Sequence, residues 1–312
     1  IAFYPEGCKP NKLIPRADAA MYAAKRAGGT RHAFFSPEMD HDAKQNFEMV
    51  RDLRRAITNN ELELYFQPKI DARSGQVTAA EALLRWNHPK LGMVMPDEFV
   101  RLAERTGLIN EMGAWVLRRA CEDVQSWRAQ GLGDLTVAVN VSPIQFHRDS
   151  IEREVTNALV ACQLPPHALE LELTESLLME SGPEVIVTLG KLKALGVRLS
   201  IDDFGTGYSS LAYLKRFPVD RLKIDQSFVR DLAQDPDDAV IIRAIIQLGH
   251  NLRLEVIAEE LADLSMERLR RSIDVGGDQL PIDEKRLSRA RRAVLKAADI
   301  LSEPDRRAGF DD

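Results

Sequence analysis

The sequence predicts an α/β fold, in which helices cover a mainly parallel sheet. From residue 61 onward, short apolar segments alternate with helical patterns, which is typical of repeated β-α units. Acidic, amide or lysine side chains also stand at the ends of successive predicted strands. Seven strands fit either an open sheet or a TIM-like (β/α)8 barrel without its last strand. The polar strand ends favour the barrel, because active sites of barrels form where strand ends converge.

The pattern of the first 60 residues predicts helices rather than a complete domain. Residues 1–4 fit the end of a strand, and residues 15–26 fit an alanine-rich helix. An amphipathic helix is predicted over residues 36–60, because apolar residues recur there at spacings of three and four: Phe47, Val50, Leu53 and Ile57. The pair Asn59-Asn60 is expected to end this helix.

The remaining elements follow in order. Strands are predicted at residues 62–70, 77–86, 135–141, 169–174, 197–202, 221–224 and 254–258. Helices are predicted between them at residues 96–106, 110–130, 150–162, 183–195, 209–215 and 237–251. Beyond residue 260 no eighth strand is predicted, and charged residues predict a helical tail at 266–272 and 284–301. Without that strand, a barrel leaves two strand edges unpaired.

Composition excludes several classes of function. The formal net charge of -6 argues against a binder of nucleic acid polymers, which needs a basic face. Three distant cysteines, Cys8, Cys121 and Cys162, predict neither a disulfide framework nor a cysteine zinc site. With no membrane segment and no signal peptide in the sequence, the expected location is cytoplasmic. Because the chain begins at Ile1, an upstream membrane or sensor domain is left as an alternative.

The polar strand ends are the candidate functional residues. Nearly all of them offer oxygen ligands, the type that Mg²⁺ and Mn²⁺ prefer over thiolate or imidazole. So dense a group of carboxylates would repel itself without cations. The set comprises Glu81, Asn140, Glu172, Glu175, Asp202, Asp203, Lys223 and Glu259.

Several of these residues also have a purely structural interpretation. Glu81 could face outward from its strand, and Asn140 could cap the following helix. Lys223 stands between Leu222 and Ile224, so it points away from both and would need carboxylate partners if buried.

Asp202 and Asp203 point to opposite faces of a regular strand, so one of them could simply be solvated. Gly205 and Gly207 follow directly and permit a turn that could direct both carboxylates toward one site.

With these motifs the chain resembles a known family. Glu81-Ala82-Leu83, followed by Arg85, is similar to the signature of EAL-domain phosphodiesterases, which hydrolyse the bacterial messenger cyclic di-GMP. The resemblance runs from Tyr65-Phe66-Gln67-Pro68 to Val256-Ile257-Ala258-Glu259. It includes Asp202-Asp203-Phe204-Gly205-Thr206-Gly207-Tyr208-Ser209-Ser210 and Lys223-Ile224-Asp225.

The resemblance implies a two-metal centre that cuts cyclic di-GMP to linear pGpG. One Mg²⁺ or Mn²⁺ ion would be held by Glu81, Asn140, Glu172 and Asp202, and a second by Asp202, Asp203 and Glu259. The two ions would activate a bridging water and stabilise the attacking and leaving oxygens. Lys223 would orient that water, and Glu175 would anchor the loop that begins at Asp203. Arg85 would meet a substrate phosphate, and Gln67 would touch the substrate near a guanine.

A second resemblance concerns the start of the chain, where residues 16–25 are similar to the last helix of a GGDEF, or diguanylate cyclase, domain. The expected domains are therefore a GGDEF-like fragment (1–37), a connecting helix (38–60), an incomplete EAL-type barrel (61–260) and a divergent tail (261–312). Members of the EAL family commonly pair through this domain, so a homodimer is expected. The alternatives to an enzyme are a non-catalytic cyclic di-GMP receptor or docking module, and an inactive truncated product.

Overall fold

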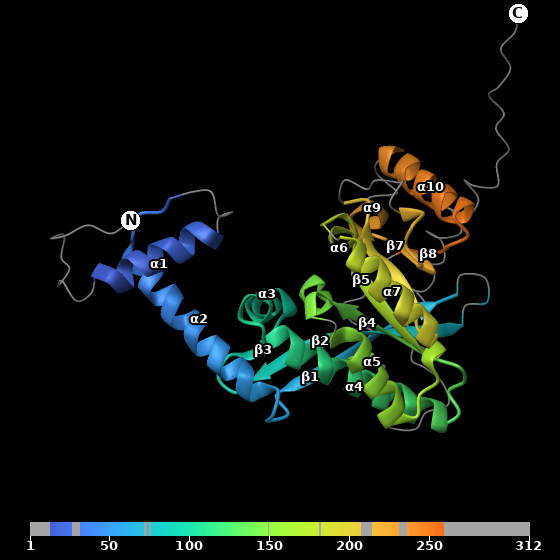
Figure 1. Cartoon of the computed structure of the whole chain (residues 1–312), viewed down its shortest axis with the longest axis horizontal. Helices are drawn as coiled ribbons and strands as arrows, with labels where there is room; N and C mark the ends of the chain where they lie inside the picture. Colours follow the sequence, from blue (N-terminus) through green and yellow to red (C-terminus); the bar gives the residue numbers. More distant parts are fainter. Residues whose placement is uncertain are drawn as a thin grey trace, which may run out of the picture. The chain divides into compact units, whose positions relative to one another are not determined.

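The computed structural model describes residues 13–26, 32–71, 74, 76–148, 150–180, 182–206, 214–230 and 236–258 (Figure 1). The chain divides into two compact units. The first comprises Ile1–Glu61 and Trp86–Leu108, and the second comprises Leu62–Arg85 and Ile109–Asp312.

The first unit is built from helices around a small apolar centre. Its elements are α1 (Leu13–Arg26), α2 (Pro37–Ala56), β3 (Gly92–Val94) and α3 (Pro96–Thr106), together with the end of β2. Trp86 and Phe99 are fully buried and meet edge to face, with ring centroids 5.7 Å apart. Helix α2 ends at Ala56 rather than at the predicted Asn59-Asn60 pair, because the chain turns over residues 57–60 and Asn60 adopts a left-handed φ of 56°.

The second unit holds the sheet. Its strands are β1 (Leu62–Ile70), β2 (Val77–His88), β4 (Thr136–Val141), β5 (Leu169–Thr174), β6 (Arg198–Phe204), β7 (Arg221–Ile224) and β8 (Glu255–Ala258). They are hydrogen-bonded in the order β1-β2-β4-β5-β6-β7-β8, and the pairs from β2 to β8 are parallel. This order follows the chain without reversal, as in a barrel and unlike a doubly wound open sheet. The fold is therefore the predicted TIM-like α/β barrel, with seven of its strands among the described residues.

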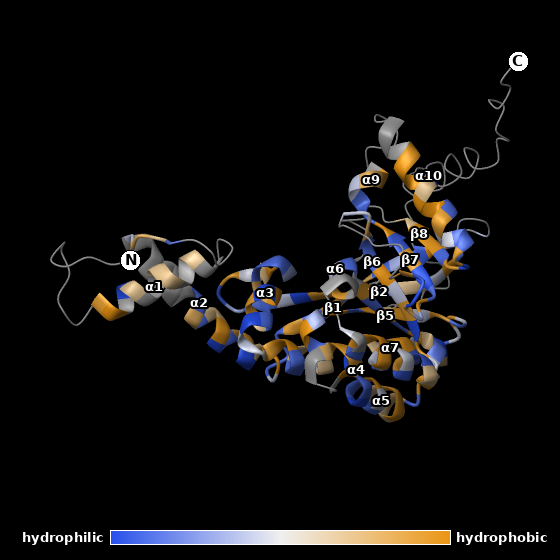
Figure 2. Ribbon diagram, turned by 45° about the horizontal axis from the view of Figure 1, so that its top comes forward, coloured by the Kyte–Doolittle hydropathy of each residue, from blue (hydrophilic) through white to orange (hydrophobic). Residues whose placement is uncertain are grey.

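The helices of this unit connect the strands. They are α4 (Leu108–Ala129), α5 (Ser150–Cys162), α6 (Glu175–Glu180), α7 (Pro183–Leu195), α9 (Gln226–Arg230) and α10 (Pro236–Asn251), with 3-10 turns at Pro143–Arg148 and Pro166–Ala168. Helix α10 packs against β7 and β8, and α5 against α7. Figure 2 shows hydrophobic and hydrophilic residues alternating along α4, α5 and α7. No helix in the described parts of the chain is both long and apolar enough to cross a bilayer.

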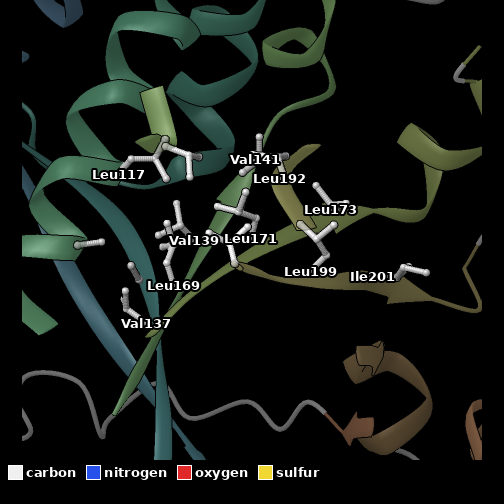
Figure 3. Packing of buried hydrophobic residues seen from close by; sticks show 14 of the residues in the cluster. Leu117, Val137, Val139, Val141, Leu169, Leu171, Leu173, Leu192, Leu199 and Ile201 are labelled. Carbon is white, nitrogen blue, oxygen red and sulfur yellow. The ribbon is translucent and has the colours of Figure 1, made fainter. Parts of the chain in front are cut away.

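The core lies between the strands and the helices. Figure 3 shows alternate residues of three strands beside Leu117 and Leu192 of the helices: Val137, Val139, Val141, Leu169, Leu171, Leu173, Leu199 and Ile201. The residues between them, such as Asn140, Glu172 and Asp202, point to the other face because side chains alternate along a strand. One face of these strands thus forms the core, and the other carries polar groups.

The elements that the sequence did not predict are short. They are β3, α6, α9 and the two 3-10 turns, in which three to six residues leave too few periodic positions to recognise. The predicted helix at 209–215 lies mostly outside the described residues. The predicted tail helices and Glu259 also lie outside them. The prediction that no eighth strand follows is therefore not tested by the described residues.

Candidate active site

Five strands each bring one predicted site residue to the polar face of the sheet: Glu81, Asn140, Glu172, Asp202 and Lys223. The parallel pairing places Asn140 beside Glu172, and Thr174 beside Asp202. Because every strand involved runs in the same direction, these side chains come together at one end of the sheet.

Lys223 is the centre of this group. Its side chain is 1% exposed, and Nζ lies 3.0 Å from Glu81 Oε2, 2.9 Å from Glu172 Oε2 and 3.0 Å from Asp202 Oδ1. A buried ammonium needs such partners, since an unpaired charge away from water is strongly unfavourable. The carboxylate partners that the sequence required for a buried Lys223 are present.

The remaining oxygen of Glu81 is also engaged, since Asn140 Nδ2 donates a hydrogen bond to Glu81 Oε1 at 2.8 Å. This hydrogen bond favours a role for Asn140 in the site over the alternative in which Asn140 caps a helix. Glu81 is 8% exposed, so it does not face outward.

The three buried carboxylates form a candidate metal site. Each of Glu81, Glu172 and Asp202 offers one oxygen, and these oxygens all lie within 4.8 Å of one another. With Asp203 close enough to interact with Asp202 and Lys223, carboxylates outnumber ammonium groups among the described residues at this end of the sheet, so negative charge remains to be neutralised. Hard oxygen donors of this kind suit Mg²⁺ or Mn²⁺, and the donor set therefore fits a divalent cation.

Lys69 is a member of this site that the sequence analysis missed. Its Nζ pairs with Glu172 and lies 3.1 Å from Glu170 Oε1. Burial alone would lower the pKa of Lys69, but the carboxylates of Glu172 and Glu170 outweigh it and raise that pKa. The signal in the sequence was the alternation of β1, where Glu63, Tyr65, Gln67 and Lys69 share the face opposite to the buried side chains of Leu62, Leu64 and Phe66.

Glu172 is the most enclosed carboxylate of the site, with a side chain that is 0% exposed. Burial raises the pKa of Glu172, and the negative charge of Glu81 acts in the same direction. Lys223 and Lys69 oppose this shift. A divalent cation would favour the ionised form in the same way as the lysines do.

Asp203 takes a different position from Asp202. Strand β6 shifts register between Ile201 and Phe204, and Asp203 itself has a left-handed φ of 54°. The turn that we attributed to the glycines therefore begins at this irregularity. Partial burial raises the pKa of Asp203 to about 6, and the charges of Asp202 and Asp225 act in the same direction. Asp203 is not part of the buried group of three.

Glu175 and Gly205 join the end of β5 to the end of β6. Glu175 is 5% exposed, and its Oε2 accepts a hydrogen bond from the backbone N–H of Gly205 at 3.1 Å. This is a contact by which Glu175 can hold the loop after Asp203. Residues 207–213 of that loop lie outside the described part of the chain.

Gly205→Ala is expected to disturb this loop. Gly205 has a φ of 105°, and an added Cβ would lie 2.9 Å from Phe228 Cε2, so both backbone and packing oppose a side chain. The strained backbone alone should lower the free energy of unfolding by about 1–3 kcal/mol. Chemical denaturation measures this change.

Gly190→Ala is the matched control, because a Cβ at that exposed position of α7 meets no atom within 4 Å. It should leave stability unchanged or raise it by up to about 1 kcal/mol. Equal stability of the two variants would contradict this account of Gly205.

The predicted substrate-binding residues lie on the neighbouring strands. Gln67 is partly buried on β1. Arg85 occupies the same face of β2 as Glu81, where one guanidinium nitrogen donates to the carbonyl of Leu84 at 2.9 Å. Its guanidinium also lies 5.7 Å from the ring centroid of Tyr65.

Comparison with known proteins gives the family. A family model described as EAL domain matches residues 50–276. The bifunctional diguanylate cyclase/cyclic di-GMP phosphodiesterase MucR of Pseudomonas aeruginosa is 46% identical over 260 residues, which are 83% of this chain and 38% of MucR. The cyclic di-GMP phosphodiesterase NbdA of the same organism is 43% identical over 260 residues, or 83% of this chain and 33% of NbdA. The chain thus spans well under half the length of these relatives.

Solved structures agree with this assignment. The PaMucR phosphodiesterase in complex with c-di-GMP matches with a TM-score of 0.66 and 44% identity, over 74% of this chain and 92% of that chain. The EAL enzyme Bd1971 in its cAMP- and cyclic-di-GMP-bound form gives a TM-score of 0.68 and 31% identity, over 82% of this chain and 67% of that chain. The sequence motifs, the strand order and these matches together establish that this chain belongs to the EAL domain family.

Proposed function

We propose that this chain is a metal-dependent phosphodiesterase that hydrolyses cyclic di-GMP to linear pGpG. The observation that carries the proposal is the buried group of Glu81, Glu172 and Asp202 around Lys223. The intact ligand positions count against the alternative of a non-catalytic cyclic di-GMP receptor. The names of the relatives MucR and NbdA support the same activity.

The ligand set follows the sequence motifs. Glu81, Asn140, Glu172 and Asp202 would hold one Mg²⁺ or Mn²⁺ ion, and Asp202, Asp203 and Glu259 a second. When bound, such ions supply Lewis acidity toward a phosphodiester and its attacking water.

The chain's own groups would position the reactants. The Nζ of Lys223 holds three carboxylates in place and would orient the attacking water. Arg85 would bind a phosphate of the substrate through its planar guanidinium, and Gln67 would contact a guanine. Glu175 would hold the loop after Asp203 through Gly205.

The test is hydrolysis by the purified chain. Cyclic di-GMP is incubated with the protein and Mg²⁺ or Mn²⁺, and the products are separated by chromatography. We expect pGpG to form only with metal, and Glu81→Gln to reduce the rate at least about 100-fold, because it removes a charged ligand but keeps the side chain's shape. Glu152→Gln, which removes an exposed partner of Lys191, should retain the rate of the parent.

Two results would contradict the proposal. Binding of cyclic di-GMP without turnover would support the receptor. A hydrolysis rate for Glu81→Gln equal to that of the parent would show that the proposed metal site does not carry the reaction. Absence of a cooperative thermal transition would favour the third alternative, a product that folds poorly and is inactive.

The domain organisation is part of the proposal. Residues 61–260 would form the phosphodiesterase domain, and 38–60 the helix that connects it to a GGDEF-type fragment at 1–37. The bifunctional name of MucR supports the last assignment. A homodimer through the EAL domain is proposed as the working assembly.

A further inference from the structure

Lys69 lies beside the proposed metal site on β1, but it cannot be a ligand, because an ammonium group does not bind a cation. Its side chain is 11% exposed and pairs with Glu172 through Oε1. The other oxygen of Glu172 lies 2.9 Å from Lys223 Nζ. Two different lysines thus hold the two oxygens of one carboxylate.

Lys69 is itself held in place by a second buried carboxylate. Glu170 stands two residues before Glu172 on β5, and its side chain is 0% exposed. Its Oε1 accepts a hydrogen bond from Lys69 Nζ at 3.1 Å. Its other oxygen pairs with Arg221, which also pairs with Glu255 at 2.7 Å. A chain of ion pairs therefore runs from Glu255 on β8 through Arg221, Glu170 and Lys69 to Glu172.

We propose that Lys69 is a positioning residue that fixes the orientation of Glu172 and thereby sets the affinity of the site for its metal ion. The inference rests on the proposed function, because Glu172 acts as a ligand only if the site binds metal. In this proposal Lys69 acts through Glu172, with which its Nζ pairs.

The site depends on Lys69 for geometry rather than for charge, because the ammonium holds one oxygen of Glu172 although its positive charge by itself opposes a bound cation. Without Lys69, Glu172 Oε1 would be a buried carboxylate oxygen with no cation beside it. Glu172 would then recover a partner by drawing Lys223 away from Glu81 and Asp202, or by turning away from them. Either change separates the three oxygens that now lie within 4.8 Å of one another. Loss of a group that orients a metal ligand typically costs 10–100-fold in metal affinity.

The experiment is calorimetric titration of Mn²⁺ into the full chain, without substrate, for the parent and Lys69→Met. We expect the dissociation constant for Mn²⁺ to rise about 10–100-fold in the variant. In the hydrolysis assay, the Mn²⁺ concentration for half-maximal activity should rise by the same factor. At saturating Mn²⁺, kcat should return to within several-fold of the parent, whereas a ligand or a catalytic residue would lower kcat at any metal concentration.

Lys193→Met is the matched control. Lys193 also pairs with a carboxylate at 2.8 Å, but that carboxylate, Asp220, is not one of the proposed ligands. Its Mn²⁺ affinity should equal that of the parent. Lys69→Arg keeps the charge and should recover part of the affinity that Lys69→Met loses, which a purely steric role would not predict.

The outcomes separate the two proposals. If the parent binds Mn²⁺ and a folded Lys69→Met variant binds it equally well, the positioning role is wrong and the proposed function stands. If the parent binds no Mn²⁺, both are wrong. If Lys69→Met does not fold, as judged by thermal unfolding, Lys69→Gln replaces it, and an unchanged Mn²⁺ affinity there would overturn the role in the same way.

Discussion

Lys223→Met is expected to abolish phosphodiesterase activity and to destabilise the sheet. The substitution leaves the carboxylates of Glu81, Glu172 and Asp202 buried around a methyl group instead of an ammonium. Removing one partner of a buried ion pair costs about 3–5 kcal/mol, because the remaining charge has no compensation. Because Lys223 is proposed to orient the attacking water, its loss should also lower kcat at least about 100-fold. Urea denaturation and the hydrolysis assay measure the two effects.

Lys193→Met provides the comparison for stability as well as for metal binding. The pair of Lys193 and Asp220 is partly exposed, so its loss should cost no more than about 1 kcal/mol. A Lys223→Met variant that unfolds at the same urea concentration as Lys193→Met would show that the central lysine does not compensate the carboxylates. Retention of full activity would exclude Lys223 from the reaction.

Leu171→Ala is expected to have the second largest effect, and on stability alone. Leu171 is 0% exposed on β5 and lies in the core between the strands and the helices (Figure 3). Truncating a fully buried leucine removes apolar contacts and leaves a cavity, which typically costs 2–5 kcal/mol. For a protein whose total stability is of the usual order of 5–15 kcal/mol, this is a large fraction. The midpoint of chemical denaturation should fall accordingly.

Leu91→Ala is the same substitution at a side chain that is 57% exposed. Its effect should lie within about 0.5 kcal/mol of zero. If the two variants were equally stable, Leu171 would not contribute to a packed core, and the assignment of this face of β5 would be wrong.

The strands were predictable from the sequence because each is a short apolar segment between turns. Leucine and glutamate alternate in the segment Leu169-Glu170-Leu171-Glu172-Leu173, and this alternation predicts which side chains are buried. Its leucines form the core, and its glutamates face the opposite side. Parallel strands joined by helices then bring their carboxyl ends to one side of the sheet, so residues distant in the sequence could be assigned to one site.

What the sequence could not give is the pairing of charges inside that site. Lys69 on β1 and Glu170 on β5 are more than 100 residues apart, and no local pattern shows that their side chains meet. The sequence likewise predicts a strand for Arg221 but not its ion pairs with Glu170 and Glu255. The bend at Asp203 depends on a shift of register between β6 and β7, which local sequence does not encode.

Anomalous diffraction from a crystal soaked in Mn²⁺ tests the central claim most directly. Our account predicts a peak between the carboxylates of Glu81, Glu172 and Asp202, with oxygen distances near those of small octahedral cations, about 2.0–2.2 Å. A map with no peak among these three carboxylates, in a crystal whose protein is folded as described, would contradict the claim that they bind a divalent metal.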